Sequence, residues 1–465
     1  MVFSTPIFLF CFLVLTLLVY YLVPRGLRNV VLLCSSLFFY FWGERIFVLI
    51  MLLSTAIDYT HGLMVERCQK NGNDKGARWA VASSVIFNLA LLFFFKYWDF
   101  IASSLQAIGL TFMPVLNIHL PIGISFYTFQ TMSYTIDVYR GDARAQRSLV
   151  NFGTFVTLFP QLIAGPIIKY KDLGDQIDSR TCTVEKFASG VQMFVIGLGK
   201  KVLIANNVGM LWESYKAMAP GDLTVAGAWL GVLAFAIQIY FDFSGYSDMA
   251  VGLGRMLGFE FMRNFNYPYI SRSITEFWRR WHISLSTWFR EYLYIPLGGN
   301  RCSKGRWVLN LFLVWAATGI WHGASWNFVL WGVMLLGFIL LEKFCIGDFL
   351  KEHKVLSHVY LLFVIPQTWV IFRITRLKDI VAYFSRLFPF FGTHSAVSAQ
   401  DALKLLSSYW WLLLLAVFFC LPQPRRFYEK HRGSLLVQLP LFLLFWVCVY
   451  FIATSSGNAF LYSRF

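Results

Sequence analysis

The chain has 465 residues, of which 58% are hydrophobic and 14% are charged. Soluble domains carry about 25% charged residues, so this composition excludes a set of ordinary water-soluble domains and predicts an all-α, polytopic membrane protein. The 40 Lys and Arg residues against 24 Asp and Glu give a net charge of +16. Because no nucleic-acid-binding motif accompanies this excess, we assign it to basic loops and to anionic lipid headgroups, and expect no nucleic-acid partner.

Apolar runs long enough to cross a membrane recur along the chain. A spanning helix needs about 20 apolar residues, and fewer when it packs against protein. The candidate runs are residues 7–23, 29–42, 46–64, 79–97, 120–139, 187–203, 229–253, 307–321, 328–341, 358–374, 409–421 and 436–452. We count about eleven spans. With no internal repeat or linker, we predict a single domain over residues 1–465.

The connections between the first five spans alternate in charge. Residues 24–28, 66–78 and 140–147 are basic, whereas the two intervening connections are not. The positive-inside rule then places the basic loops in the cytoplasm and the N-terminus on the outer side. The first run has no basic leader and no clear cleavage site, so we interpret it as a span and not as a removed signal.

The middle of the chain is less regular. In residues 152–168 an apolar run is interrupted by Pro160, Gly165 and Pro166, which predicts a broken or re-entrant segment. Lys200 and Lys201 come near the end of another run, where we expect them to reach toward a membrane interface.

Residues 255–306 hold nine Lys and Arg residues and three Glu, too many charges for a plain span. Apolar side chains nevertheless recur at helical spacing, at Phe277, Trp281, Leu285, Trp288 and Tyr292. This pattern predicts an amphipathic helix at the cytoplasmic interface.

His322 is the strongest candidate for chemistry, because ionisable residues inside an apolar segment are costly and indicate function. A neutral imidazole can accept the proton of a hydroxyl group that attacks an acyl carbonyl. Thr318, Ser325 and Asn327 are candidates to orient it. The alternative is a structural histidine hydrogen-bonded between helices.

His282 alone is better explained as an interfacial histidine, four residues after Trp278 and four before Ser286. The nearby arginines, Arg279, Arg280 and Arg290, can face lipid headgroups or a phosphate-bearing donor. Asp242 and Asp248 are either functional or paired with arginines such as Arg255. The eight cysteines are scattered without a C-x-x-C pair, and no metal-binding motif is present, so we expect no metal site.

Several stretches together resemble the membrane-bound O-acyltransferase family, in the branch of the alginate O-acetyltransferase membrane subunits. They are LPIGISFYTFQ at 120–130, FPQLIAGP at 159–166, YFDFSGYSD at 240–248, NFNYPYIS at 264–271, the block 276–301, and WHGA at 321–324. The D-alanyl transferase of teichoic acid assembly and the bacterial cellulose acetylation protein are similar relatives.

The resemblance implies a multi-helix fold with a central tunnel, through which an acyl group from cytoplasmic acetyl-CoA reaches an extracytoplasmic acceptor. It implies that His322 is the catalytic histidine and His282 the second functional one. The remaining tunnel or donor-binding candidates are Arg279, Arg280, Trp281, Ser286, Arg290, Asn327, Asp242 and Asp248. A periplasmic acetyltransferase and a polysaccharide secretion complex are the implied partners, and the bacterial inner membrane is the implied location.

The C-terminus is similar to an aromatic tail of this group whose tyrosine is a candidate acyl acceptor. Tyr462 stands at that position, whereas Ser463 replaces an aromatic residue and Ala459 replaces a common proline. The resulting hypothesis is a membrane O-acyltransferase that acetylates an exported, alginate- or cellulose-like polysaccharide. One alternative is transfer of D-alanine or another acyl group to teichoic acid, lipid or protein, and a non-enzymatic alternative is a transporter or flippase.

Overall fold

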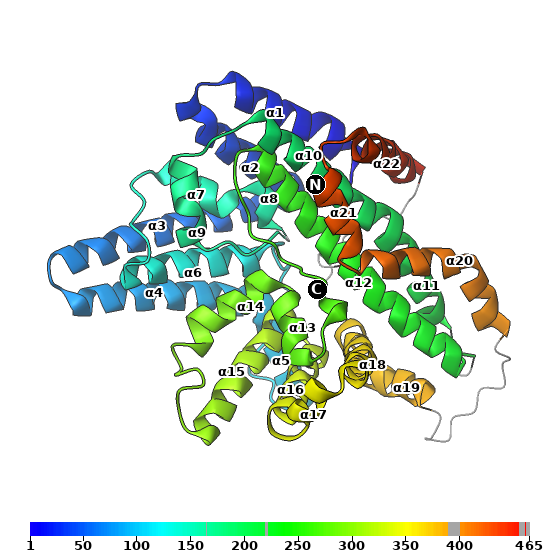
Figure 1. Cartoon of the computed structure of the whole chain (residues 1–465). Coiled ribbons are helices and arrows are strands. Elements are labelled where there is room, and N and C mark those ends of the chain that lie inside the picture. The colour runs from blue at the N-terminus through cyan, green and yellow to red at the C-terminus, as the bar shows by residue number, and fades with distance from the viewer. Residues whose placement is uncertain (164, 219–221, 389–399, 455–460, 462–465) are drawn as a thin grey trace. The chain divides into compact units, whose positions relative to one another are not determined.

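The structure is a computed structural model that describes all residues except 164, 219–221, 389–399, 455–460 and 462–465, and describes residues 400–402 by their backbone. Every regular element among the described residues is a helix, which confirms the predicted all-α class (Figure 1). The chain forms two compact units, residues 1–194 with 247–262 and residues 195–246 with 263–465. The long helix α12, Val225–Met256, passes from the second unit into the first. Whether the units form one domain remains a prediction.

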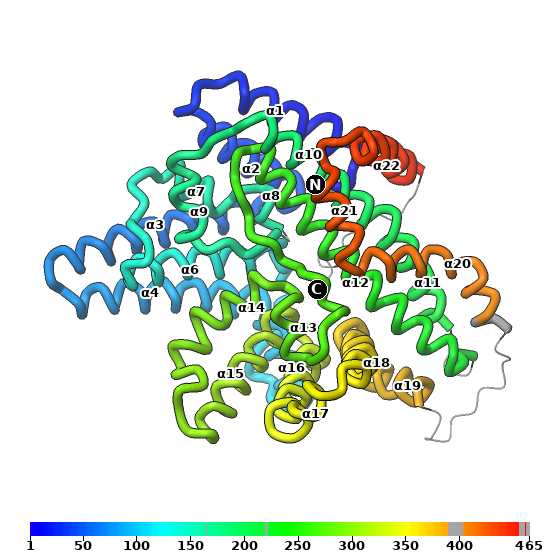
Figure 2. The backbone as a smooth tube through the Cα atoms, in the orientation of Figure 1, coloured from blue at the N-terminus to red at the C-terminus, as the bar shows by residue number. Residues whose placement is uncertain are grey.

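The first unit is organised around α6, Ile124–Arg140, in which 14 of 17 residues are buried. The hairpin of α3, Val48–Lys70, and α4, Asp74–Leu92, lies beside it (Figure 2). The other helices of this unit are η1 (Ile7–Phe12), α1 (Leu13–Leu22), η2 (Arg25–Leu27), α2 (Arg28–Glu44), η3 (Arg45–Phe47), η4 (Phe93–Tyr97), α5 (Trp98–Ala107), α7 (Leu149–Thr157), α8 (Phe159–Leu162), α9 (Tyr170–Asp178) and most of α10 (Val184–Gly199).

A buried polar network joins α3, α4 and α6. Asp58 of α3 is fully buried and accepts hydrogen bonds from Ser84 and, at 2.8 Å, from the Asn88 amide of α4. The Asn88 oxygen in turn accepts from Thr131 of α6 at 3.1 Å. Because buried polar groups destabilise a fold unless they are hydrogen-bonded, this network fixes the register of the three helices.

The second unit contains a helical hairpin made of α15, Lys304–His322, and α16, Trp326–Leu341. Its other helices are η5 (Lys200–Ala205), α11 (Asn206–Ala217), η6 (Pro268–Ile270), α13 (Ile274–Arg280), α14 (Ile283–Phe289), η7 (Arg290–Tyr294), η8 (Glu342–Ile346), α17 (Gly347–Glu352), α18 (Lys354–Arg373), α19 (Leu377–Leu387), α20 (Gln400–Phe419), α21 (Gln423–His431) and α22 (Leu435–Thr454). Helix α18 packs against α16. Helices α15, α16 and α18 carry His322 and the aromatic residues around it.

Seven helical runs among the described residues are long and apolar enough to cross a membrane, or up to eight if the bent pair Leu403–Phe419 and Gln423–His431 is one span. This finding confirms a polytopic membrane protein. The run Arg25–Lys70 contains both the second and the third predicted spans. The first predicted span is the shorter helical segment Ile7–Leu22. Our larger estimate therefore counted these segments separately, and it also included residues 120–139 and 307–321, which lie outside the runs found among the described residues.

The predicted interruption in residues 152–168 is confirmed. Helix α7 ends at Thr157, and the four-residue helix α8 begins at Phe159 with proline in its first turn. The Gln161 side-chain amide donates to the Phe155 carbonyl at 2.6 Å, which satisfies a carbonyl that the helix break exposes.

Two predictions for the middle of the chain are wrong. The amphipathic stripe is not one helix at an interface, because α13 ends at Arg280 and α14 begins at Ile283. Four of the five stripe residues are buried inside the protein: Phe277, Trp281, Leu285 and Trp288. Lys201 does not reach an interface either, since it is buried and forms an ion pair with Asp242.

We predict that Gly332→Ala destabilises the protein. A Cβ atom at Gly332 would lie 2.5 Å from the Trp315 carbonyl oxygen, where the backbones of α15 and α16 approach closely. Overpacking of this kind costs about 1–3 kcal/mol and should lower the melting temperature of the detergent-solubilised protein. Gly337→Ala on the same helix is the control, because a Cβ atom added there would meet nothing within 4 Å. Equal melting temperatures for the two variants would contradict the close approach.

Candidate active site

Both candidate histidines lie in the second unit and pack against the same side chain, Trp321 of α15. The ring centroid of His322 is 5.1 Å from that of Trp321, and the ring centroid of His282 is 6.1 Å from it. His282 is 1% exposed and His322 is 7% exposed. Two histidines 40 residues apart in the sequence are therefore held in one water-poor region.

His322 is the last residue of α15, and aromatic rings surround its imidazole. Besides Trp321, the rings of Trp331 and Phe372 lie 5.1 and 5.3 Å away, each nearly perpendicular to the imidazole at 88° and 80°. Such edge-to-face contacts fix the plane of the ring and exclude water from around it.

The aromatic surroundings depend on hydrogen bonds between helices. Asn327, in the first turn of α16, is fully buried and donates to the carbonyls of Ile371 and Phe372 at 3.0 and 3.1 Å. It therefore holds the end of α18, with Phe372, against the start of α16. Thr318 donates to the Val314 carbonyl at 2.7 Å, and Ser325 is the N-cap residue of α16. Asn327 therefore supports the position of Phe372 beside His322.

His282 connects α13 to α14 in a strained conformation. Its φ of 44° lies in the left-handed region, which non-glycine residues rarely adopt and which concentrates at functional sites. The Asn264 side-chain oxygen accepts from the Ser284 backbone N–H at 3.1 Å and from its hydroxyl at 2.9 Å. His282 Nδ1 lies 3.2 Å from the same oxygen.

These contacts define the tautomer of His282. Because the Asn264 oxygen is an acceptor, Nδ1 carries the proton and Nε2 carries the lone pair in the neutral ring. Burial lowers the pKa of His282 from its ordinary value of 6.5 to about 3. His282 is outside the candidate spans and stays neutral near pH 7.

Trp281 and Ser286, two other predicted site residues of the block 276–301, take part in packing and in a bond between helices. Trp281 is buried, with its ring stacked on Phe277 at 5.5 Å and near Trp369 at 4.8 Å. Ser286 donates to the Trp278 carbonyl at 3.1 Å and so fastens α14 to α13. The block therefore contributes aromatic packing next to the histidines.

The three arginines lie at more exposed positions. Arg280 is paired with Glu276 at 2.8 Å, and Arg290 lies 3.5 Å from Glu291. Arg279 is exposed. Their role as a frame for a donor entrance remains a prediction.

The two aspartates belong to different units. Asp242 lies in the second unit and pairs with Lys201, whereas Asp248 lies in the first unit and is half-buried. The predicted alternative partner Arg255 instead lies 3.2 Å from Glu260. Asp242 is thus paired with a lysine, and a functional role for either aspartate remains a prediction. Tyr462, with Ala459 and Ser463, lies outside the described residues.

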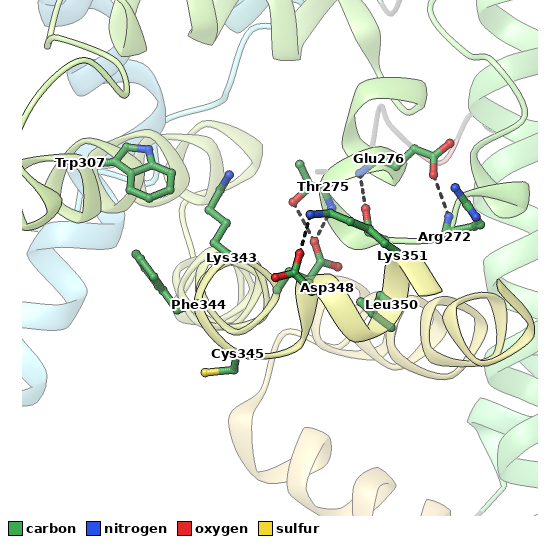
Figure 3. A pocket seen from close by; sticks show the side chains of 13 residues that line it. Arg272, Thr275, Glu276, Trp307, Lys343, Phe344, Cys345, Asp348, Leu350 and Lys351 are labelled. Atoms are coloured by element: carbon green, nitrogen blue, oxygen red, sulfur yellow. Dashed lines mark hydrogen bonds and ion pairs between the residues drawn. The ribbon is translucent and has the colours of Figure 1, made fainter. Parts of the chain in front are cut away.

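A pocket of about 470 Å³ opens at the other end of the α15–α16 hairpin (Figure 3). Its basic residues are Arg272, Lys343 and Lys351, and its acidic residues are Glu276, Glu342 and Asp348. Glu342 accepts from the Thr275 backbone N–H at 3.0 Å and hydroxyl at 2.8 Å, and so caps the start of α13. The charge of the lining is balanced, so the pocket does not by itself indicate a site for an anion.

Some residues of the site were not assigned from the sequence. Asn264 lies within one of the motifs that carry the family resemblance, but its bond to His282 joins positions 18 residues apart. Phe243, whose ring lies 4.7 Å from that of His282, follows Asp242 directly. No group of three His, Cys, Asp or Glu residues in the described parts of the chain is arranged to hold a metal ion.

The all-helical fold with several candidate membrane spans agrees with the result of sequence comparison. The model of the membrane-bound O-acyltransferase family matches residues 37–377, and the chain belongs to this family. It is therefore an O-acyltransferase and an integral membrane protein that crosses the membrane several times.

Individual relatives narrow the comparison. The chain is 46% identical to a probable alginate O-acetylase of Azotobacter vinelandii, over 84% of this chain and 78% of the relative. It is 30% identical to the peptidoglycan O-acetyltransferase of Helicobacter pylori, over 100% of this chain and 98% of the relative. A teichoic acid D-alanyltransferase of Bacillus subtilis is 29% identical over 54% of this chain and 64% of the relative.

We predict that His282 makes the folded protein less stable in acid. Its folded-state pKa of about 3 is below the ordinary 6.5, so the unfolded state binds a proton first as the pH falls. The stability contributed by the neutral ring is complete above about pH 6.5 and is lost toward pH 3, by about 1.4 kcal/mol per pH unit.

Thermal unfolding between pH 7.5 and 4.5 measures this effect. His282→Gln should show a shallower fall in melting temperature than the wild type, while His353→Gln, at an exposed position, should keep the wild-type slope. Identical slopes for the wild type and His282→Gln would mean that His282 is protonated alike in both states.

Proposed function

We propose that this protein transfers acetyl groups from cytoplasmic acetyl-CoA for O-acetylation of an exported polysaccharide of the alginate or cellulose type. The similarity to probable alginate O-acetylases supports acetyl as the acyl group and a polysaccharide as the final acceptor. The named peptidoglycan O-acetyltransferase, which also modifies a glycan polymer, supports the same reaction class. We place the protein in the bacterial inner membrane with its N-terminus outside, acting with a periplasmic acetyltransferase and the secretion complex.

The observation that carries this proposal is His322 enclosed by three aromatic rings at the C-terminus of α15. In acyl transfer an acceptor hydroxyl oxygen attacks the thioester carbonyl carbon, the carbon–sulfur bond breaks, and the hydroxyl proton passes to a base. His322 is suited to be this base. The negative end of the α15 dipole stabilises the imidazolium that forms, and the dry aromatic walls hold the reacting groups together.

His282 fits a different role. A base with a pKa of about 3 is too weak to remove a hydroxyl proton near pH 7, where general bases work best with a pKa close to the ambient pH. Its lone pair on Nε2 is instead suited to accept a hydrogen bond from the acceptor hydroxyl and so to orient it. We therefore assign proton transfer to His322 and orientation of the acceptor to His282.

Acetate released by mild base from the secreted polysaccharide tests the proposal. At matched membrane protein levels, His322→Ala should lower polymer acetate by roughly 100-fold or more, because general-base catalysis contributes about 10²–10⁴-fold. His353→Ala, at an exposed helix end, is the control and should retain full acetylation. Unchanged polymer acetate in His322→Ala would show that His322 is not the essential base. Loss of the secreted polymer itself would indicate that the protein acts in polymer export.

The partial similarity to a teichoic acid D-alanyltransferase supports D-alanine as an alternative acyl group. Supplying purified protein with acetyl-CoA and with D-alanyl thioesters separates the two. Preferential consumption of the D-alanyl donor would replace acetyl in the proposal, and substrate movement without covalent transfer would favour a flippase.

A further inference from the structure

A buried ion pair lies in the second unit, between Lys201 of η5 and Asp242 of α12. Each side chain is 3% exposed. The two residues belong to different candidate spans, Val184–Ala217 and Val225–Met256. Charged groups inside such segments are costly even when paired, and their presence there indicates a function.

Leu461 also binds this pair. The Leu461 backbone N–H donates to Asp242 Oδ2 at 3.0 Å, across 219 residues of sequence. Lys201 pairs with the other oxygen, Oδ1, and Leu461 itself is 8% exposed. The Asp242 carboxylate therefore joins Lys201 of η5 and Leu461 to α12.

Asp242 is close in the sequence to residues that contact the candidate active site. Phe243 follows Asp242, and its ring lies 4.7 Å from His282 at 87°. Tyr240, two residues before Asp242, lies 6.1 Å from the Trp281 ring. A single turn of α12 thus contacts both Leu461 and the surroundings of His282.

We propose that the Lys201–Asp242 pair is a receptor for Leu461 of the same chain, and that docking of Leu461 on this pair is required for efficient acyl transfer. Asp242 and Lys201 are positioning residues in this proposal. They hold Leu461, the residue before Tyr462 in the sequence, on the helix turn that supports His282. The transfer part rests on the proposed function, whereas the docking part does not.

Two pairs of variants test the docking. Leu461→Pro removes the donating N–H, while Leu461→Ala shortens the side chain and keeps the N–H. In the second pair, Lys201→Met with Asp242→Leu removes both charges and the acceptor, while Lys201→Met with Asp242→Asn removes the charges and keeps an acceptor oxygen. Both double variants avoid leaving one buried charge without its partner, which would threaten folding.

The first measurement is digestion of the detergent-solubilised full-length protein with a carboxypeptidase, followed by intact mass. Leu461→Pro should lose its last residues roughly tenfold faster than Leu461→Ala, because a hydrogen bond to a charged group is among the stronger ones. The double variant with Asp242→Leu should be digested as fast as Leu461→Pro. The double variant with Asp242→Asn should be digested more slowly than the one with Asp242→Leu. Equal digestion within both pairs would overturn the docking.

The second measurement is polymer acetate in the same variants at matched membrane levels. Acetate should fall in Leu461→Pro and in the Asp242→Leu double variant, and should recover in the Asp242→Asn double variant. Faster digestion with unchanged acetate would overturn the requirement for transfer. If the wild type itself acetylates no polymer, the proposed function fails while the digestion result still decides the docking.

Discussion

The fold depends on the high free-energy cost of a polar group that is buried without a hydrogen bond. In a protein that is mostly apolar, a buried polar group is stabilised by a partner inside the chain, and the partner then fixes the geometry around it. Asp58 and Asn88 together join three helices of the first unit in this way. In the second unit, Asn327 fixes the end of α18 against the start of α16 through two carbonyls. The Asn327 hydrogen bonds thus fix the position of Phe372, and the Phe372 ring forms part of the surroundings of His322.

The two histidines differ because their local electrostatics differ. His282 is oriented by a neutral amide oxygen, and burial keeps its ring uncharged. His322 stands at the carbonyl end of a 19-residue helix, where a developing positive charge is favoured. A reaction that creates an imidazolium is therefore better supported at His322, while a permanently neutral ring is better supported at His282. The same residue type performs two tasks because one lies at a helix end and the other between two short helices.

The sequence was sufficient for features that depend on neighbouring residues. Apolar runs predicted the helical membrane fold, and the prolines around residue 160 predicted the break between α7 and α8. The break at His282 was not predictable in the same way, because Phe277, Trp281 and Leu285 keep a helical spacing across it. Tertiary contacts override that spacing: the Asn264 side chain binds Ser284, and the Asn264 backbone carbonyl accepts from the Ile283 N–H at 2.9 Å. Partners that lie far apart in sequence, such as Lys201 and Asp242, leave no local pattern to detect.

An ion pair is a costly way to hold the Leu461 backbone, and its chemistry explains why it would be retained. A backbone N–H entering an apolar region needs an acceptor, and a carboxylate accepts more strongly than a neutral oxygen. Lys201 then balances the charge that makes Asp242 a strong acceptor. Replacing such a pair by apolar residues often leaves stability unchanged or raises it, so stability alone gives little reason to keep it. The gain is specificity, since one defined backbone donor is selected and held beside the helix turn that supports His282. A segment held in the same chain is also present at a high effective concentration, which a free partner would reach only by binding.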